Sequence, residues 1–424
     1  MIGVAVLAAA TVPDSSYRTQ WGTPKAVTAE LAVLFGLGAL ALALGAVIAA
    51  VAAPPRPVAA VWPDLDDGRF ALLRRASTVL TALTVTGYVA FAGLALARGV
   101  TPAVVLDAVT SGVYAADLRT RIGTLPGLTT MTQFGPAAAV VSGLLLARDG
   151  RDRAEWAKLG AVVVLALPRA YLMTERLAVL EILVPLVVVA ACAGSTRPRT
   201  ARRLSFAPAV ALPGLVAVFA AFEYSRSWNF YRARTDSGFA QFALERFAGY
   251  YTTAVNNAAL RMQYMADLTG WPRATLEFLW SAPGVSALDL HRRLSGVDTA
   301  QVYADVLVAH GNPEFNNDGG IADPFLDYGT LGGLALLVAV GFVAATLYRG
   351  MRESRPAGLL FYPFLFLGLL ELPRYLYWTQ GRTLPAIAGL AVVAVLLHRS
   401  RPPVPAVPVP PPAVAEPTVA EIAR

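Results

Sequence analysis

The sequence predicts an all-α polytopic membrane protein with about nine or ten transmembrane helices and one large extracytoplasmic loop that contains amphipathic helices. Three observations predict this class. The chain of 424 residues is 56% apolar and only 15% charged, with a mean hydropathy of +0.54, whereas a soluble domain carries about 25% charged residues. Apolar stretches that could cross a bilayer recur along the chain, with clusters of Arg and Lys beside them. One long polar stretch, residues 223–327, interrupts the series.

Nine apolar stretches are expected to cross the bilayer, whose hydrocarbon core of about 30 Å needs about 20 helical residues, or fewer when the ends snorkel. In the N-terminal bundle, residues 1–222, the expected spans are residues 31–53, 78–97, 126–147, 159–172, 177–194 and 206–222. In the C-terminal part, residues 328–398, they are residues 329–347, 356–370 and 383–397. Residues 1–12 are a candidate tenth span, although a helix of this length reaches only about 18 Å.

The basic residues predict the orientation, because loops rich in Arg and Lys stay in the cytoplasm. If the nine spans alternate, fifteen basic residues of the short loops fall on one side and seven on the other. The side with seven holds residues 111–124, 169–176 and 371–382 together with the long loop. These segments are therefore expected to share the extracytoplasmic face. Residues 399–424, rich in Pro, Val and Ala, are expected to form a disordered cytoplasmic tail.

The long loop, residues 223–327, is expected to have helices of its own. Aromatic and apolar residues recur at helical spacing over residues 239–254 and 260–265, which indicates amphipathic helices lying on the membrane surface. Two further helices are expected near residues 286–294 and 299–309. The only cysteine of the chain lies in an apolar run, so the sequence predicts neither a disulfide in the loop nor a cysteine-based metal site.

Charged residues interrupt the apolar residues 159–194 and indicate a first functional cluster. Arg169, Glu175, Arg176 and Glu181 lie within or at the edge of these apolar runs. A charge at membrane depth costs about 3 kcal/mol even on lenient insertion scales, so such groups usually pair or line a wet cavity. The simpler alternative is that both arginines snorkel at the tip of a hairpin while Glu175 pairs with one of them.

A second cluster lies at the end of the long loop. It comprises residues 312–327 together with three charged residues of an earlier outer loop, Asp117, Arg119 and Arg121. Residues 316–320 alone fit an ordinary Asx and glycine turn. A calcium loop is a further alternative, since Glu314 and Asp318 match its beginning, but Phe325 stands where that loop needs a glutamate. The sequence therefore predicts no metal ion and no cofactor.

Together the two clusters predict a cavity with guanidinium and carboxylate groups that opens on the outer face. Guanidinium pairs suit phosphate, and aromatic side chains such as Tyr250, Tyr251 and Trp280 suit the flat faces of sugars. A polyprenyl diphosphate that carries an oligosaccharide combines a tail for the lipid bilayer, a diphosphate for the interface and sugars for the loop. The net charge of +7 requires no nucleic acid as a partner, because the basic residues cluster beside apolar runs.

Three stretches, within roughly residues 78–399, resemble the bacterial oligosaccharide repeat unit polymerases, the Wzy-like O-antigen and exopolysaccharide polymerases. Residues 174–181 place Glu-Arg at the opening of a very apolar helix, and residues 247–261 resemble the helix early in that family's external loop. Residues 312–333 resemble the close of that loop, where an aspartate, an aromatic residue and glycines lead into the next span. The resemblance implies a GT-C-like glycosyltransferase in the cytoplasmic (inner) membrane, with its active site facing the extracytoplasmic side.

The resemblance also implies roles for individual residues. A glycan is passed from its undecaprenyl diphosphate carrier to another lipid-linked unit. The expected diphosphate ligands are Arg119, Arg121, Arg169, Arg176 and Arg261, and the expected catalytic residues are Glu175, Arg176 and Asp327, with His310 as an alternative base. The expected glycan contacts are Tyr250, Tyr251, Asn316, Asn317 and Asp323. The arginines supply the positive charge that a metal supplies elsewhere, and a chain-length regulator and a flippase of the same pathway are expected partners.

Three alternatives stay open. A ligase that transfers a finished glycan to a lipid or wall acceptor uses the same carrier and membrane face, so the sequence does not separate it from a polymerase. A glycosyltransferase that uses a monophosphate sugar would draw on Asp64 and Asp67, which are expected on the cytoplasmic side. A transporter or flippase would spread its polar groups over several broken helices at mid-membrane, whereas here the charged residues gather toward one face.

Overall fold

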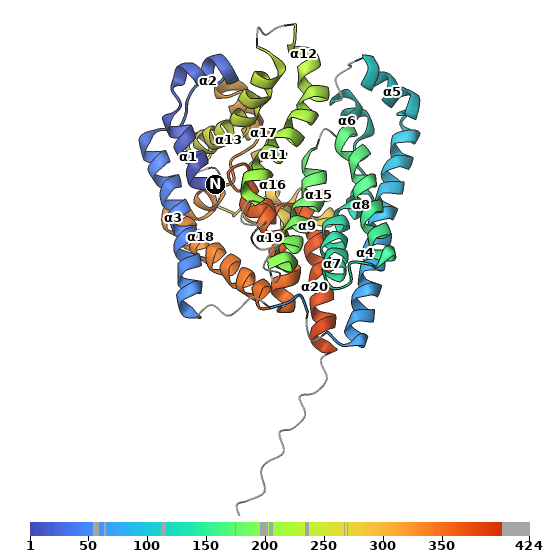
Figure 1. Ribbon diagram of the computed structural model, residues 1–424. Helices are drawn as coiled ribbons and strands as arrows, with labels where there is room; N and C mark the ends of the chain where they lie inside the picture. Colours follow the sequence, from blue (N-terminus) through green and yellow to red (C-terminus); the bar gives the residue numbers. More distant parts are fainter. Residues whose placement is uncertain are drawn as a thin grey trace, which may run out of the picture.

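The computed structural model describes residues 1–53, 59–62, 65–111, 116–173, 175–195, 202, 207–233, 237–266, 268 and 270–400. All regular secondary structure in these residues is helical, so the predicted all-α class is confirmed. Figure 1 shows the longer helices lying side by side in one bundle, with shorter helices gathered toward its upper end. The predicted tail, from residue 401 onward, lies outside the described residues.

Within the described residues, six helices are long and apolar enough to cross a membrane, which is the architecture of a multi-pass membrane protein. They are α3 (Ala29–Ala52), α4 (Asp67–Ala97), η1 with α7 (Thr129–Phe134 and Gly135–Arg148), α9 (Leu177–Ser195), α18 (Asp323–Arg352) and η4 with α20 (Gly381–Thr383 and Leu384–Arg399). Each overlaps one of the predicted spans, although η1 begins three residues after the predicted residue 126. Helix α4 begins well before the predicted residue 78, because the Asp66 side chain accepts a hydrogen bond from the Arg69 N–H at 2.8 Å and caps the helix there.

The three other predicted spans are also helices, namely α8 (Arg153–Leu172), α11 (Ala207–Glu223) and α19 (Pro356–Glu371). Helix α8 carries four charged residues, and α11 and α19 have only 17 and 16 residues. Helix α19 packs against α9 and α18, and α8 packs against α4 and α7, so helices that could cross the membrane flank both. The candidate tenth span is α1 (Ile2–Thr11), which has ten residues and packs on α3 and α13 (Phe239–Tyr264).

Contacts between helix ends show that three of the basic loops of the predicted cytoplasmic side, those in the described residues, lie together. Arg148, at the end of α7, donates to a main-chain carbonyl just ahead of α4 at 2.8 Å. Arg74 of α4 forms an ion pair with Asp152 ahead of α8, and Arg349 of α18 donates to a carbonyl near the end of α3 at 3.0 Å. The opposite end of the bundle in Figure 1 holds α2 (Asp14–Trp21), α5 (Pro102–Ser111) and α6 (Ala116–Ile122).

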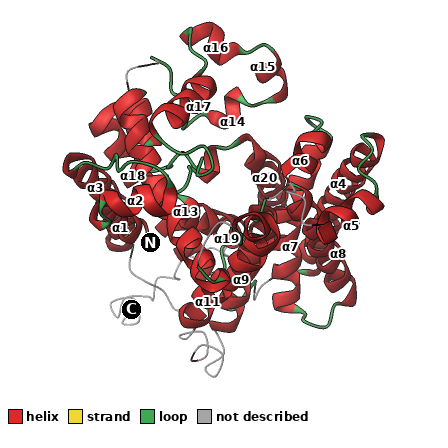
Figure 2. Cartoon of the chain, turned by 90° about the horizontal axis from the view of Figure 1, so that it is seen from above, coloured by secondary structure: helices red, strands yellow, loops and turns green. Residues whose placement is uncertain are grey.

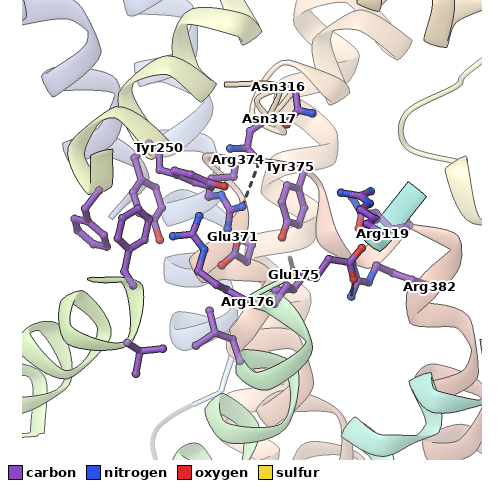
Figure 3. A pocket seen from close by; sticks show the side chains of 17 residues that line it. Arg119, Glu175, Arg176, Tyr250, Asn316, Asn317, Glu371, Arg374, Tyr375 and Arg382 are labelled. Atoms are coloured by element: carbon purple, nitrogen blue, oxygen red, sulfur yellow. Dashed lines mark hydrogen bonds and ion pairs between the residues drawn. The ribbon is translucent and has the colours of Figure 1, made fainter. Parts of the chain in front are cut away.

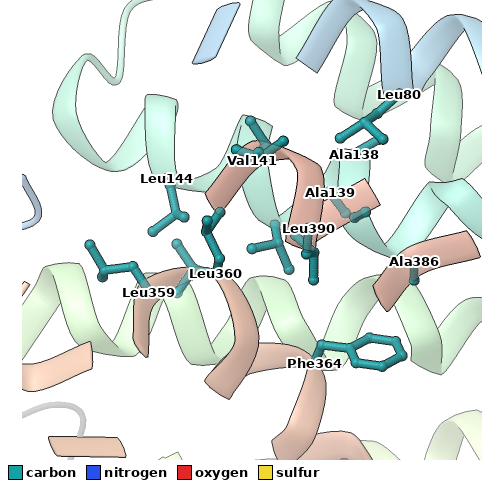
Figure 4. Packing of buried hydrophobic residues seen from close by; sticks show 14 of the residues in the cluster. Leu80, Ala138, Ala139, Val141, Leu144, Leu359, Leu360, Phe364, Ala386 and Leu390 are labelled. Carbon is teal, nitrogen blue, oxygen red and sulfur yellow. The ribbon is translucent and has the colours of Figure 1, made fainter. Parts of the chain in front are cut away.

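The main apolar core surrounds α7, whose residues 135–145 are all buried. Figure 4 shows side chains of α4, α19 and α20 packed around this helix. A second close contact joins α3 and α18. A Cβ at Gly45 would lie 1.9 Å from the Val338 carbonyl oxygen, and a Cβ at Gly341 would lie 1.9 Å from the Leu42 carbonyl oxygen. Glycine at these positions therefore allows the two helices to pack this closely.

The long loop begins with the irregular turns η2 (Tyr224–Trp228) and α12 (Asn229–Tyr231) and continues into the single long helix α13. The first half of α13 alternates between buried and exposed residues as predicted, but residues 252–261 are all buried. The sequence predicted a position on the membrane surface, but this half lies inside the protein. The physical reason is that the side chains of Asn256 and Asn257 bond main-chain groups of residues 24–26 and 315–317.

Four short helices follow α13 and form a lobe that Figure 2 shows at one side of the bundle. They are α14 (Glu277–Trp280), α15 (Pro283–Ala287), α16 (Leu290–Ser295) and α17 (Thr299–His310). The helix predicted at residues 286–294 is divided between α15 and α16, since Asp289 between them has a left-handed φ of 48°. The helix predicted at residues 299–309 is α17. This lobe touches the bundle where α14 packs on η4 and α17 packs on α13.

Helix α18 contains a break where the long loop enters the membrane helix. Gly329 has a φ of 67°, which interrupts the helical path. Residues 323–328 therefore form a turn of their own, ahead of the apolar part of α18. This break agrees with the predicted start of the span near Gly329, and it separates Asp323 and Asp327 from the membrane helix. The remaining described element is η3 (Tyr377–Thr379), in the loop between α19 and α20.

Candidate functional site

A cavity of about 250 Å³ collects polar side chains from five separate segments of the chain (Figure 3). Its polar lining consists of Arg119, Arg176, Arg374, Arg382, Glu175, Glu371, Tyr250, Tyr251, Tyr375, Asn316, Asn317 and Gln380. We call it the arginine cavity, since four arginines line it together with two glutamates. Seven residues that the sequence singled out line this cavity: Arg119, Glu175, Arg176, Tyr250, Tyr251, Asn316 and Asn317.

Arg176 lies just ahead of α9, and aromatic rings and a carboxylate hold its guanidinium group. The guanidinium carbon lies 4.0 Å from the centre of the Phe219 ring and 4.3 Å from the centre of the Tyr250 ring. Its Nη1 lies 3.2 Å from Glu223 Oε1, and the Glu223 side chain is fully buried. Arg176 therefore does not snorkel to solvent as an isolated hairpin residue.

Glu223 continues into a chain of charges that leads away from the cavity along α13. Its second oxygen lies 3.4 Å from Arg246 Nε. Arg246 donates in turn to Glu314 at 2.8 Å, and the Tyr231 hydroxyl donates to the other oxygen of Glu314 at 2.8 Å. Burial opposes the charge on Arg246, but Glu314 and Glu223 outweigh it and raise the pKa of Arg246 above its usual value. A fully buried carboxylate between two guanidinium groups is the compensated arrangement that burial of a charge requires.

Arg374 approaches the cavity from the loop between α19 and α20. It donates to Glu371 at 2.6 Å and to the Asn317 side-chain oxygen at 3.2 Å. Its guanidinium carbon lies 4.8 Å from the centre of the Tyr250 ring, so Arg176 and Arg374 contact the same tyrosine. Burial opposes the charge on Arg374, but Glu371 and the surrounding tyrosines outweigh it and raise the pKa of Arg374, which keeps the group positive.

Arg382 and Arg169 share the carboxylate of Glu175. Arg382 lies 3.6 Å from Glu175 and 3.0 Å from Glu181, and Arg169 lies 3.5 Å from Glu175. The pairing of Glu175 with Arg169 is the one that a simple hairpin would make, while the contact with Arg382 comes from a loop about 200 residues away in the sequence. The buried Glu181 also accepts a hydrogen bond from the Tyr377 hydroxyl at 3.0 Å. Both carboxylates therefore hold arginines in place.

Arg119 and Arg121, both on α6, differ in where they lie. Arg119 lines the arginine cavity with an exposed side chain. Arg121 approaches Gly99, where an added Cβ would lie 3.5 Å from Arg121 Nη2, and it lines none of the three cavities described here. The structure thus brings Arg119 to Arg176 and leaves Arg121 outside, because residues two apart on a helix face different sides.

The closing segment, residues 312–322, presents Asn316 and Asn317 to the cavity. Asn257 of α13 donates to the Phe315 carbonyl at 2.5 Å and to the Asn317 carbonyl at 2.8 Å. The Gly319 N–H donates to the Arg374 carbonyl at 2.8 Å. At Gly320 an added Cβ would lie 2.2 Å from the Tyr375 carbonyl carbon. The segment is therefore fixed between α13 and the loop that carries Arg374.

A second cavity, of about 570 Å³, adjoins the first and is bounded by η1 and parts of α4, α8 and α20. Most of its wall is apolar, with Phe91, Met131, Phe134, Met173, Leu384 and Pro385 among the lining residues. We call it the apolar cavity. Arg169 lines it, and Glu175, Gln380 and Arg382 line both this cavity and the arginine cavity. Arg169 thus lies next to the arginine cavity, behind Glu175.

A third cavity, of about 210 Å³, contains the other sequence-predicted residues, Arg261, Asp323 and Asp327. We call it the acidic cavity, since Asp318 and Glu277 also line it. Arg261 donates to the buried Asp323 at 2.6 Å. Arg261 follows Tyr250 by three helical turns, which places it on the same face of α13 but about 16 Å further along the axis. Arg261 therefore does not join Arg176, and Asp327 does not line the arginine cavity.

Other candidates from the sequence lie away from the arginine cavity. His310 stacks on Tyr264 with 4.2 Å between ring centres and lines none of the three cavities. Glu314, the first residue of the considered calcium loop, is bonded to Arg246 and Tyr231. Among the described residues, no group of three His, Cys, Asp or Glu side chains could hold a metal ion. Asp64 lies outside the described residues.

Sequence reasoning missed several charged residues of the arginine cavity and its surroundings. These are Glu223, Arg246, Glu371, Arg374 and Arg382. The available signal was the same one that identified Arg169 to Glu181, namely charges of both signs at the end of an apolar run. Glu371 and Arg374 end the apolar residues 356–370 in this way.

The arginine cavity and the apolar cavity together could bind a lipid that carries phosphate and sugars. Four guanidinium groups beside a large apolar cavity can hold a phosphate-bearing lipid, and the tyrosines and asparagines of the arginine cavity can contact sugars. Comparisons of the chain with protein-family models, curated proteins and solved structures found no match. The assignment of a function therefore depends on the residues around the cavities.

Proposed function

We propose that the chain is a glycosyltransferase that polymerises lipid-linked oligosaccharide repeat units at the outer face of the cytoplasmic membrane, on a GT-C-like membrane fold. It transfers a glycan from a polyprenyl diphosphate carrier, such as undecaprenyl diphosphate, to another lipid-linked unit. The observation that carries the proposal is the convergence of Arg119, Arg176, Arg374 and Arg382 on one cavity. That cavity is at the end of the bundle opposite the basic loops, and the apolar cavity adjoins it.

The arginine cavity supplies the positive charge that a diphosphate needs. The guanidinium groups of Arg176 and Arg374 both contact the Tyr250 ring. Arg119 adds an exposed guanidinium group to the lining of the cavity. Guanidinium groups bind phosphate oxygens through two parallel N–H bonds. Because the buried carboxylates already orient Arg176 and Arg374, little reorganisation is needed when an anion binds.

The apolar cavity suits the first isoprene units of the carrier. Its apolar walls lie between helices that are long enough to cross the membrane, and it shares Glu175 and Arg382 with the arginine cavity. A lipid tail in the apolar cavity would place its diphosphate beside the arginines. The sugars would then reach the closing segment, where Asn316 and Asn317 offer amide groups and Tyr250 and Tyr251 offer ring faces.

The arginines stabilise the leaving group in the proposed reaction. As the bond between the anomeric carbon and the phosphate oxygen breaks, additional negative charge grows on the diphosphate. The fixed guanidinium groups therefore stabilise the transition state more than the ground state. Glu175 is poorly suited to act as the base, since Arg169 and Arg382 already share its carboxylate. Its role in the proposal is to orient these arginines.

Two neighbouring arginines of α6 provide a matched test. Arg119→Ala removes a guanidinium group from the cavity, whereas Arg121→Ala removes the same group two residues away, outside it. Both side chains are exposed, so neither change should impair folding. In cells whose own copy of the gene is deleted, Arg119→Ala should give short polymer and Arg121→Ala should give polymer of wild-type length.

Arg176→Lys tests whether the planar geometry of the guanidinium group matters in addition to its charge. Lysine keeps the positive charge but cannot form two parallel bonds to a phosphate or lie flat on Tyr250, so polymer length should fall almost as far as with Arg176→Ala. Full-length polymer in Arg119→Ala and Arg176→Lys cells, with protein present in the membrane, would remove the proposed phosphate role. The deletion strain distinguishes a polymerase from a ligase. Cells that lack a polymerase accumulate single repeat units, whereas cells that lack a ligase accumulate long carrier-linked chains.

A further inference from the structure

The acidic cavity contains a carboxylate that the proposed donor site does not use. Four carboxylates line this cavity, those of Glu277, Asp318, Asp323 and Asp327. Asp323 accepts from Arg261 at 2.6 Å, and Asp318 lies 3.7 Å from the same arginine. Asp327 accepts hydrogen bonds from the main chain. Glu277 is half-buried, and its carboxylate makes neither a hydrogen bond nor an ion pair with the residues that the structure describes.

Asp327 holds the segment that carries Glu277. It accepts from the main-chain N–H groups of Arg273 at 2.9 Å, Ala274 at 3.3 Å and Thr275 at 2.7 Å, and from the Thr275 hydroxyl at 2.6 Å. Glu277 follows two residues later as the first residue of α14. At the other end of this segment, Ser281 packs closely against Gly381, where an added Cβ would lie 2.1 Å from Ser281 Oγ. Asp327 is therefore a positioning residue for Glu277.

Glu277 faces the place where the three cavities meet. It lines both the acidic cavity and the apolar cavity. Tyr375 lines both the acidic cavity and the arginine cavity, and Gln380 lines all three. A sugar in the acidic cavity would thus reach the junction from a cavity other than the one that holds the four arginines, so acceptor and donor would not compete for the same space.

The surroundings of Glu277 favour uptake of a proton. Burial raises the pKa of the Glu277 carboxyl above its usual value, Arg273 partly opposes this, and Asp318 adds to it. Arg261 and Arg382 are the other charged groups that act on it, and both lower the pKa. A carboxylate with a raised pKa is a stronger base than an ordinary one and accepts a proton more readily from a hydroxyl group.

We propose that the acidic cavity binds the terminal sugar of the acceptor glycan and that the Glu277 carboxylate takes the proton from the attacking hydroxyl. This inference rests on the proposed glycosyl transfer. The hydroxyl oxygen forms a bond to the anomeric carbon of the donor glycan while the bond from that carbon to the phosphate oxygen breaks. The electron pair of the broken bond stays on the polyprenyl diphosphate among the arginines, and the hydroxyl proton passes to Glu277.

The test uses the full chain in lipid nanodiscs with a polyprenyl diphosphate oligosaccharide as both donor and acceptor. Glu277→Gln keeps the size of the side chain but accepts no proton. It should lower the transfer rate about a hundredfold while the affinity for the donor stays at the wild-type value. The wild-type rate should rise with pH as Glu277 loses its proton, and this limb of the pH profile should disappear in Glu277→Gln. Asp327→Asn should lower the rate as well, through displacement of the 273–277 segment.

The control is Asp305→Asn, which neutralises an exposed carboxylate of the same lobe. Asp305 accepts a hydrogen bond from Gln301 and lines none of the three cavities. If Glu277→Gln fails to reach the membrane, Glu277→Asp replaces it, since it keeps the charge and should bind donor but transfer slowly. Transfer by Glu277→Gln at the wild-type rate, with an unchanged pH profile, would overturn this inference and leave the proposed function intact. A wild-type chain that neither binds nor transfers the donor would instead overturn the proposed function itself.

Discussion

Replacement of Glu223 by Gln is expected to weaken the folded state and to disturb the arginine cavity. Glu223 is fully buried and lies 3.2 Å from Arg176 and 3.4 Å from Arg246. Breaking a buried ion pair by removing one charge costs about 3–5 kcal/mol, because the other charge remains buried without compensation. Glutamine keeps the volume and one oxygen, and Arg246 keeps its bond to Glu314 at 2.8 Å, so the lower end of that range applies. We therefore expect a loss of about 3 kcal/mol in the free energy of unfolding.

Glu314→Gln provides the matched comparison. Glu314 also bonds Arg246, but 29% of its side chain is exposed, so water compensates part of the lost charge. The expected loss is smaller, about 1 kcal/mol or less. Denaturant titration of the purified chain, followed by tryptophan fluorescence, measures both values.

The polymer length in cells provides the functional readout of the same change. Since Glu223 orients Arg176, Glu223→Gln should shorten the polymer even in cells that hold a normal amount of protein. Addition of Arg176→Met should recover part of the lost stability, because it removes the uncompensated charge, but it should not recover the polymer. Equal stability of Glu223→Gln and the wild type, or a larger loss in Glu314→Gln, would refute the reasoning.

Three further changes around the cavities test close packing, stacking and titration. Gly320→Ala should slow polymerisation roughly tenfold to a hundredfold, because its Cβ would lie 2.2 Å from the Tyr375 carbonyl carbon and displace the closing segment; a wild-type rate would contradict this. His310→Ala should leave the rate unchanged, since His310 stacks on Tyr264 outside the cavities, and a large loss would restore it as a base. Burial, with Arg273 in addition, lowers the pKa of His291, while Asp327 and Asp289 oppose this; the folded state therefore resists a proton that the unfolded state binds below about pH 6.5. Amide hydrogen exchange in α14–α16 should accordingly rise as the pH falls below that value, and His291→Phe should remove the dependence.

The membrane helices could be predicted because apolarity is a property of each segment by itself. The approach of Arg119 to Arg176 could also be anticipated, since alternation of the spans places residues 111–124 and 169–176 at the same end of the bundle. The order of the spans does not predict which charged residues pair with one another at that end of the bundle. Glu175 and Glu181 pair with Arg382, which follows them by about 200 residues, and nothing in the local sequence of either segment indicates that pairing.

Two misplacements have a different physical cause. Residues 252–254 and 260–261 of α13 were expected at the membrane surface, because they belong to stretches in which aromatic and apolar residues recur at helical spacing. In the fold these residues are buried, since Asn257 and Arg261 bond the main chain and carboxylate of residues 315–323. Asp327 was expected to act on substrate, but the turn ahead of Gly329 directs it to three main-chain N–H groups. A polar residue in a sequence does not reveal whether it serves a ligand or the backbone.

Binding of a diphosphate lipid tests the central claim most directly. Calorimetric titration of the purified chain with farnesyl diphosphate, and with farnesyl monophosphate for comparison, measures whether the arginine cavity recognises the diphosphate. Each charged hydrogen-bonding group is worth about 1.5–3 kcal/mol, so Arg176→Ala and Arg374→Ala should each weaken diphosphate binding roughly tenfold to a hundredfold. Arg121→Ala should bind it as the wild type does. Equal affinity of the wild type and all three variants for the diphosphate would contradict the account.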